Sequence, residues 1–236
     1  MKAQLLLTPT AAKYLIAEAL FKKIDFSKRI YVAYGSTNQI FLEKLGIKFD
    51  ELYVAGCFTN KSLNVTKSRP DIVVLQNKKK INIKDFDITK DDYFIKGANA
   101  LWYENGKKHA AVAAADDKGG TFGNFYIKAA CRGSKVIIPV THEKLIPFYT
   151  PSSQNVDLAM GSKIAMLRFF YGEVYTEIEA FKELFGVEAK VIASGGILGN
   201  EGSLIFEIEG ERAKEAFEFA KEANSYIFDK RAEFLY

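Results

Sequence analysis

The sequence has few of the residues from which disulfides and metal centres are built. It contains two cysteines and two histidines among 236 residues. Cys57 and Cys131 stand far apart with no CxxC spacing, so reduced and buried thiols are expected. His109 and His142 lack the spacing of metal ligands. We therefore expect no metal site, and the sequence implies no cofactor.

Long apolar runs are also missing. No stretch approaches the roughly 20 apolar residues that a membrane-spanning helix needs. Near the amino terminus, the three leucines at 5–7 are followed closely by Pro9 and are too few for the apolar core of a secretory signal. We expect a cytoplasmic protein without a membrane partner.

The charge balance excludes little. The formal net charge is +4 and the pI is about 8.8, and the basic residues are interleaved with acids along most of the chain. One basic cluster stands out, formed by Lys61, Lys67, Arg69 and Lys78–Lys80. It lacks the interleaved aromatics of a nucleic-acid surface, so a solvated turn is favoured and no nucleic-acid partner is expected.

An apolar content of 48% over 236 residues is enough for a full core, in one large domain or two small ones. The predicted strands of the first part lie at 29–34, 52–58, 71–76, 93–96, 111–115 and 135–140, with an alternating stretch at 80–88. Those at 93–96, 111–115 and 135–140 are continuous apolar runs, as in a parallel sheet covered on both faces. We predict a doubly wound, Rossmann-like α/β domain over residues 1–155, beginning with a packing helix capped by Thr8.

The pattern changes after residue 155. A strand at 164–170 precedes a helix that Thr176 and Glu179 open as a capping box. Strands at 189–193 and 204–209 follow, and the last helix has alanines and Phe217 on one face. This β-α-β-β-α order predicts a second, smaller ferredoxin-like α+β domain over residues 156–236.

Small and polar residues gather where two apolar runs end, at Lys96–Asn99 and at Asp116–Thr121. In open α/β sheets this is where ligands bind. A helix over residues 122–132 is predicted after the second loop, with Thr121 as N-cap and Gly133 in the left-handed position beyond its end. Glycine amides at its start and the charge of Lys118 favour an anion there.

A third candidate is the turn Gly35-Ser36-Thr37 between a predicted strand and a helix. It is equally well read as a phosphate turn or as a simple helix start with a capping hydroxyl. The glycine-rich loop at 194–203 is either functional or a hairpin connection, and we favour the hairpin because Glu201 is the sole charge in it.

These motifs resemble those of a known superfamily. Gly35-Ser36-Thr37 resembles the phosphate turn of ribose-5-phosphate isomerase type A, and Asp92–Gly97 resembles its Asp-Leu-Ile-Lys-Gly strand end. Gly97–Ala100, Asn105-Gly106 and Lys118–Thr121 are similar to the corresponding series of the family of translation initiation factor 2B and methylthioribose-1-phosphate isomerase. Both groups share the fold of glucosamine-phosphate deaminase, ribose-phosphate isomerase and CoA transferase, and the resemblance covers roughly residues 28–145.

The resemblance implies a sugar-phosphate site. Its candidate catalytic residues are Lys96, Asp92 and Asp116. Its candidate ligand-binding residues are Gly35, Ser36, Thr37, Gly97, Ala98, Asn99, Lys118, Gly119, Gly120 and Thr121. One departure matters, because Asn99 stands where the family has an acid, and an amide cannot transfer the proton that an isomerisation moves.

Three hypotheses follow. The first is a protein that binds a small phosphorylated or nucleotide-like ligand at the carboxyl edge of the sheet. The second is a sugar-phosphate isomerase-like enzyme in which Asp92, Asp116 or Asp117 replaces the missing acid. The third is a structural or oligomer-forming module without a ligand. The binding hypothesis is favoured, and a homodimer is compatible with the sequence.

Overall fold

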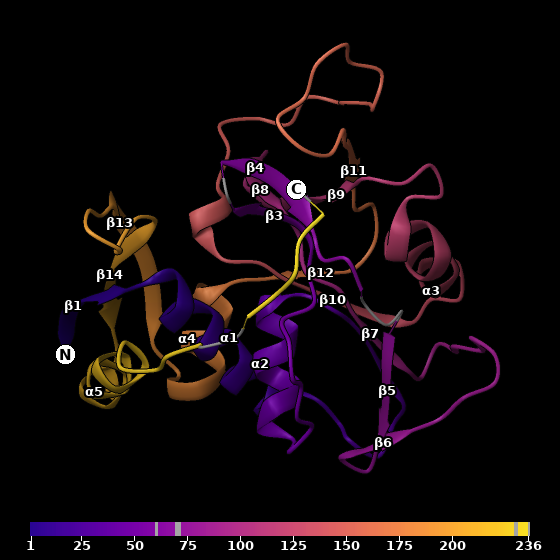
Figure 1. Ribbon diagram of the computed structural model, residues 1–236. Coiled ribbons are helices and arrows are strands. Elements are labelled where there is room, and N and C mark those ends of the chain that lie inside the picture. Colours follow the sequence, from indigo (N-terminus) through magenta and orange to yellow (C-terminus); the bar gives the residue numbers. More distant parts are fainter. Residues whose placement is uncertain (60, 69–71, 229–230, 236) are drawn as a thin grey trace.

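The computed structural model describes residues 1–59, 61–68, 72–228 and 231–235. It is a mixed α/β structure with several sheets, and one of these sheets is partly parallel (Figure 1). Arg69 of the basic cluster and Asp71, the first residue of the predicted strand 71–76, lie outside the described residues.

The largest sheet has six strands in the order β12-β10-β7-β2-β5-β6. They span Glu173–Tyr175, Lys135–Pro139, Tyr93–Ile95, Ile30–Ala33, Ile72–Gln76 and Lys79–Ile81 respectively. The first four run parallel to one another, while β5 and β6 are antiparallel to their neighbours. The parallel part therefore has a single carboxyl edge, where the chain leaves β2, β7 and β10. The predicted parallel strands at 93–96 and 135–140 are confirmed.

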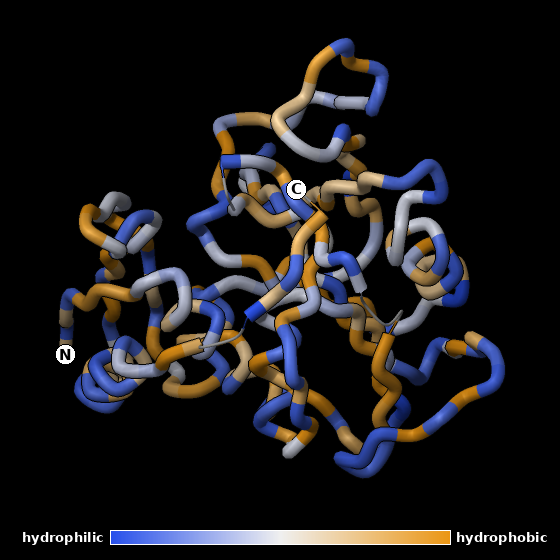
Figure 2. The backbone as a smooth tube through the Cα atoms, viewed as in Figure 1, coloured by the Kyte–Doolittle hydropathy of each residue, from blue (hydrophilic) through white to orange (hydrophobic). Residues whose placement is uncertain are grey.

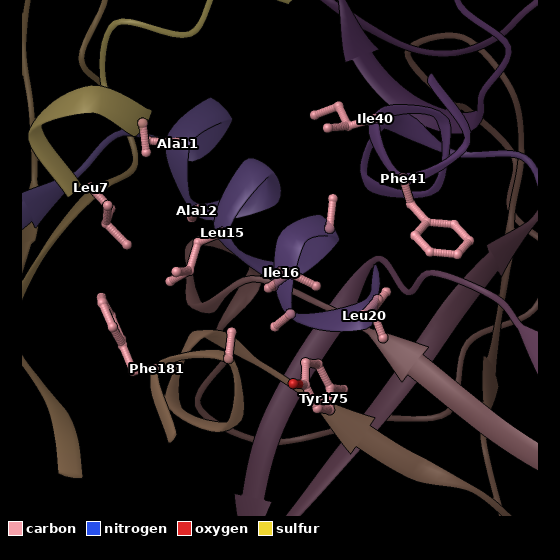
Figure 3. Packing of buried hydrophobic residues seen from close by; sticks show 14 of the residues in the cluster. Leu7, Ala11, Ala12, Leu15, Ile16, Leu20, Ile40, Phe41, Tyr175 and Phe181 are labelled. Carbon is pink, nitrogen blue, oxygen red and sulfur yellow. The ribbon is translucent and has the colours of Figure 1, made fainter. Parts of the chain in front are cut away.

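Both faces of the sheet are buried at its central strands β2, β5, β7 and β10, whose side chains alternate between two apolar clusters. Ile30 and Val32 pack in the first cluster and Tyr31 in the second. The first is the larger, and Figure 3 shows part of it around α1 (Pro9–Lys23), with Leu15, Ile16 and Leu20 pointing into it. Figure 2 shows one of the central strands, β5, as an orange apolar segment.

Two helices of this layer begin as local sequence dictates. The Thr8 hydroxyl accepts a hydrogen bond from the amide of Ala11 at 3.2 Å, and Pro9 occupies the first helical position, which confirms the predicted start of α1. The second helix, α2 (Ser36–Lys44), follows β2 through Gly35 and packs against α1. Its N-terminus thus lies at the carboxyl edge of the sheet.

The predicted parallel strand at 111–115 is wrong in its direction and in its sheet. It belongs to β9 (Lys107–Ala114), which lies between β8 (Ala100–Glu104) and β11 (Ala165–Arg168) in a separate antiparallel sheet. A continuous apolar run reports burial on both faces but carries no information on direction. A two-residue turn at Asn105-Gly106, with φ of 51° and 73°, joins β8 to β9. Asn-Gly is the typical sequence of such a hairpin turn.

A third sheet has the order β1-β14-β13, formed by Lys2–Leu7, Ser203–Glu209 and Glu188–Gly195. Helices α4 (Glu177–Phe185) and α5 (Ala213–Ala223) pack beside it (Figure 1), and the capping box of Thr176 and Glu179 is confirmed. The strand predicted at 164–170 exists as β11 but pairs with β9 rather than joining this sheet. The amino-terminal β1 pairs with β14 instead, because its alternating Leu5 and Leu7 are buried against α1 and α5.

The chain after Asp116 folds differently in detail from the prediction. A π-helix, η1 (Phe122–Tyr126), leads into the short α3 (Ile127–Cys131). Gly133 has a φ of 69°, so the predicted left-handed end of this helix is confirmed. Thr121, in contrast, is helical itself and makes no capping hydrogen bond, so its predicted N-cap role is wrong.

Two further elements complete the surroundings of the carboxyl edge. Within the predicted strand 52–58 only the last residues are extended, as β3 (Ala55–Thr59), which pairs with β4 (Ser62–Val65) in a two-stranded hairpin. The 3-10 helix η2 (His142–Lys144) follows β10. The cysteines are free, but Cys57 is half-buried and Cys131 is exposed, so the expectation that both thiols are buried is wrong.

Candidate functional site

A cavity of about 550 Å³ opens at the carboxyl edge of the parallel strands. The segments after β2, β7 and β10 line it, namely Tyr34–Asn38, Lys96–Asn99 and Pro139 with Glu143–Ile146. Residues from α1, β3 and β9 complete the wall. Its size and position are typical of small-molecule sites in α/β proteins.

The N-terminus of α2 faces this cavity. Gly35, Ser36 and Thr37 line it, and no side chain caps the helix there. The first amides of a helix have no acceptor within the helix and carry the positive end of its dipole. A Cβ at Gly35 would meet no heavy atom within 4 Å, so the space beside these amides is open. The nine residues of α2 therefore present donors suited to an anion.

Three lysines line the same cavity, Lys13 from α1, Lys96 after β7 and Lys144 in η2. Glu143 is the sole carboxylate among the described residues of the wall. Its Oε1 lies 3.0 Å from the Lys13 Nζ and accepts a hydrogen bond from the Thr141 hydroxyl at 3.0 Å. Three positive groups against one negative group leave a formal excess of two positive charges, which favours an anionic ligand.

Lys144 lies in an environment that lowers the pKa of its side chain. Its Nζ donates a hydrogen bond to the carbonyl oxygen of Ala98 at 2.8 Å. Burial of the ammonium group, followed by the charge of Lys13, lowers the pKa of Lys144 to about 8, against the smaller opposing effects of Glu143 and Glu177. Part of the Lys144 population is therefore neutral amine near physiological pH.

The 3-10 helix that carries Glu143 and Lys144 is held by a buried carboxylate. Glu177, at the start of α4, is fully buried and accepts the backbone N–H of His142 at 3.0 Å. It also lies 2.6 Å from the His142 Nδ1, while the Nε2 lies 2.9 Å from the Tyr103 hydroxyl. Glu177 thus fixes the position of His142, and with it the positions from which Glu143 and Lys144 reach the cavity.

The Asn99 side chain links strands β3 and β9 through hydrogen bonds. Its Nδ2 donates to the carbonyl of Gly56 at 2.7 Å, and its Oδ1 accepts the N–H of Ala113 at 3.0 Å. This arrangement needs one donor and one acceptor on the same side chain, which a carboxylate cannot supply. The amide at position 99 is explained by these contacts between β3 and β9.

Asn38, in the first turn of α2, also lines the cavity and is 1% exposed. Its Nδ2 donates to the carbonyl of Ala33 at 2.7 Å. Within the described part of the chain, its buried Oδ1 has no hydrogen-bond partner. This Oδ1 is itself shielded from solvent, so its lack of a partner does not by itself indicate a ligand contact.

The predicted anion site at Gly119–Thr121 has much less room. A second hollow, of about 20 Å³, is lined by Asp116, Gly119, Gly120, Thr121 and Lys96. That volume holds about one water molecule and not a phosphate group. The Asp116 Oδ1 already accepts the amides of Lys118 and Gly120, both at 2.9 Å. The loop therefore satisfies its own donors with a carboxylate.

Lys96 separates the two hollows and borders both. It is 6% exposed, and its Nζ donates a hydrogen bond to the Thr121 hydroxyl at 2.6 Å. This contact connects the segment after β7 to the start of the helical segment at 120–131. The structure thus brings Lys96 together with Gly35–Thr37 and Gly97–Asn99 in the larger cavity, and with Asp116 and Gly119–Thr121 in the smaller one.

Two predicted residues lie elsewhere. Lys118 is exposed and lines neither hollow among the described residues. Asp92 precedes β7 whereas Lys96 follows it, so Asp92 sits at the opposite, amino edge. There it is 5% exposed and accepts hydrogen bonds from Arg29 at 2.9 Å and from the amide of Thr89 at 2.7 Å.

Sequence reasoning missed Lys13, Asn38, Glu143 and Lys144. Three of them carried a usable signal, since Asn38 directly follows Gly-Ser-Thr, and Glu143 and Lys144 follow β10 as Lys96 follows β7. Lys13 gave none, because it looks like an ordinary polar residue on the solvent side of α1. Only the packing of α1 beside α2 brings it to the cavity.

Comparisons of the sequence with models of known protein families and with curated proteins find no match. Among the helices of the described residues, none combines the length and the apolar character needed to span a membrane.

Proposed function

We propose that the protein binds a small phosphorylated ligand in the cavity at the carboxyl edge of its parallel strands. One observation carries this proposal: the N-terminus of α2, uncapped by any side chain, faces a cavity of about 550 Å³ that three lysines also line. Backbone amides at a helix start and lysine ammonium groups are two of the common ways in which proteins hold phosphate.

The polar groups around the cavity favour a sugar phosphate or a related phosphorylated polyol over a bare anion. Ser36 and Thr37 bring hydroxyls beside the amides of α2. A ligand with hydroxyl groups next to its phosphate can exchange hydrogen bonds with them. The superfamily resemblance of Gly35-Ser36-Thr37 and Asp92–Gly97 points to the same ligand class.

The finer description of the fold belongs to the same proposal. Parallel β2, β7, β10 and β12, buried on both faces, support a Rossmann-like reading of the six-stranded sheet. The sheet β1-β14-β13 with α4 and α5 supports a ferredoxin-like arrangement for residues 156–236 only if β1 takes the place of the strand predicted at 164–170. The division into domains at residue 155 stays a prediction.

The isomerase-like alternative has one structural support. Glu143 places a carboxylate in the cavity, although it is ion-paired with Lys13 at 3.0 Å. Asp116 is engaged by backbone amides at the smaller hollow, and Asp92 lies at the other edge of the sheet. An ion-paired carboxylate is a weak base, so binding remains the function that we propose.

A thermal-shift screen with matched pairs tests the proposal. Glycerol 3-phosphate is compared with glycerol, and ribose 5-phosphate with ribose. We expect the phosphorylated member of at least one pair to raise the melting temperature, with stabilisation that grows as RT ln(1 + [L]/Kd). If no phosphorylated compound stabilises the protein more than its unphosphorylated counterpart, the proposed function is wrong.

A further inference from the structure

Lys144 is placed differently from the other lysines of the cavity. Lys13 is ion-paired with Glu143, and Lys96 donates to the Thr121 hydroxyl. Lys144 instead donates to a neutral backbone oxygen, that of Ala98. Within the described residues, no carboxylate lies within 4 Å of its Nζ, although Glu143 is its neighbour in sequence. Glu143 and Glu177 favour the charged form of Lys144, but burial and the charge of Lys13 outweigh them.

Buried amines beside another cation are the form in which lysine acts as a nucleophile. Because its pKa is lowered to about 8, a larger share of Lys144 is neutral amine near neutral pH than of an ordinary lysine. The groups that face Lys144 in the cavity are Lys13 from α1, Lys96 after β7 and Glu143 on its own element, with Glu177 of α4 nearby. Of these groups, Lys13 opposes the protonation of Lys144, whereas Glu143 and Glu177 favour it.

We propose that Lys144 forms an imine with a carbonyl group of the phosphorylated ligand. This inference rests on the proposed function, because the α2 N-terminus must hold the phosphate while the carbonyl reaches the amine. It narrows the ligand class to phosphorylated aldehydes and ketones, such as the open-chain form of a sugar phosphate. It also gives the cavity a chemical activity that a simple binding site does not have.

The reaction needs no further reactant. The lone pair of the Lys144 Nζ attacks the carbonyl carbon, and the carbonyl oxygen takes a proton to give a carbinolamine. The hydroxyl then leaves as water while nitrogen loses its second proton and the C=N bond forms. Water is the product released, and nothing is oxidised or reduced.

Two triose phosphates that differ only in the carbonyl test this inference. Dihydroxyacetone phosphate has the ketone, and glycerol 3-phosphate has a hydroxyl in its place. Binding of each is first measured by thermal shift without reductant. Each is then incubated with the full chain and sodium borohydride, which reduces an imine to a stable amine, and the modified lysine is located by peptide mass spectrometry. The same is done with ribose 5-phosphate and ribitol 5-phosphate.

Three variants accompany the wild type. Lys144→Met removes the amine, Lys144→Arg keeps the charge without a nucleophilic amine, and Lys90→Met removes an exposed lysine outside the cavity. We expect a reduced adduct on Lys144 with a carbonyl compound and none with its alcohol. Labelling of Lys144 should exceed that of exposed lysines by about one to two orders of magnitude at pH 7.5. The adduct should disappear in both Lys144 variants and persist in Lys90→Met.

The outcomes separate the two proposals. If the phosphates stabilise the protein but no carbonyl compound is trapped, or if the adduct persists in Lys144→Arg, the imine is overturned and phosphate binding stands. If no phosphorylated compound binds and none is trapped, both proposals fall. An adduct confined to Lys144 and limited to carbonyl compounds supports the imine.

Discussion

At the scale of single residues, the amide of Asn99 is explained by its hydrogen bonds and needs no catalytic role. It donates to Gly56 and accepts from Ala113 at the back of the cavity. In Asn99→Asp, a carboxylate oxygen would face the Gly56 carbonyl oxygen with no proton between them. We expect a loss of about 1 to 3 kcal/mol in the free energy of unfolding, measured by urea denaturation at pH 7.

The control for this change is Asn124→Asp, which makes the same substitution at an exposed position. It should shift the unfolding free energy by less than about 0.5 kcal/mol. Equal stability of Asn99→Asp and wild type would show that the tie between β3 and β9 is not needed, and that Asn99 has another role.

Asp92 is a structural residue in this account, although the resemblance suggests a catalytic one. It is buried at the amino edge and binds Arg29 and Thr89. Asp92→Asn should destabilise the protein by about 3 kcal/mol, because it leaves the guanidinium without its buried partner. Asp87→Asn removes the exposed partner of Arg29 and should cost less than about 1 kcal/mol.

Ligand binding separates the two readings of Asp92. The Kd for glycerol 3-phosphate should be the same in Asp92→Asn and wild type below the melting temperature, because Asp92 lies at the edge of the sheet opposite to the cavity. A large loss of affinity in a still folded Asp92→Asn protein would contradict this placement.

The pKa of Lys144 makes a prediction for stability against pH. Its folded-state pKa, about 8, is below the unfolded value near 10.4, so between these values the unfolded chain binds more protons. Stability from this residue therefore rises with pH through this window and is absent below it. The buried tyrosines Tyr31, Tyr126 and Tyr175, whose pKa values are raised, oppose it at higher pH, so the comparison requires a variant.

The unfolding free energies of wild type and Lys144→Met, measured at pH 7 and pH 9.5, isolate the effect. The difference between the two proteins should move in favour of the wild type by on the order of 1 to 2 kcal/mol over this interval. A difference that stays constant would show that Lys144 titrates as an ordinary lysine, and it would remove one support for the imine.

At the scale of elements, the π-helix η1 depends on a glycine. A Cβ on Gly123 would lie 1.8 Å from the backbone oxygen of Lys118, which no side-chain movement relieves. We expect Gly123→Ala to destabilise the protein by at least about 2 kcal/mol and to disturb the contact between Lys96 and Thr121. Asn124→Ala, the exposed next residue in the same element, should be nearly neutral by the same thermal unfolding measurement.

The elements also show what sequence can and cannot predict. The ends of β2 and β7 were predictable, because each continuous apolar run stops at small and polar residues that must meet at one edge if the strands are parallel. The direction of β9 was misread, because its alanine-rich run is buried whichever way it runs. The Asn105-Gly106 turn held the correct signal, as a hairpin.

At the scale of the whole molecule, the cavity is assembled from segments far apart in the chain. Lys13 and Lys144 line it together only because α1 packs between the six-stranded sheet and the sheet β1-β14-β13 (Figure 1), and β1 pairs with β14 some two hundred residues later. Pattern and spacing in a sequence carry no information on such distant contacts. The half of the site built on strand ends could be predicted, and the half brought in by helix packing could not.

The central claim is that a phosphorylated ligand occupies the cavity at the α2 N-terminus rather than the loop at Gly119–Thr121. The most direct measurement is the Kd of glycerol 3-phosphate, by isothermal titration calorimetry, for wild type, Gly35→Ala and Lys118→Met. The methyl group of Gly35→Ala meets no protein atom within 4 Å but occupies the space beside the amides. We predict at least about tenfold weaker binding for Gly35→Ala, with an unfolding free energy within about 1 kcal/mol of wild type, and unchanged binding for Lys118→Met. Unchanged binding in Gly35→Ala together with a marked loss in Lys118→Met would contradict the account and return the site to the predicted loop.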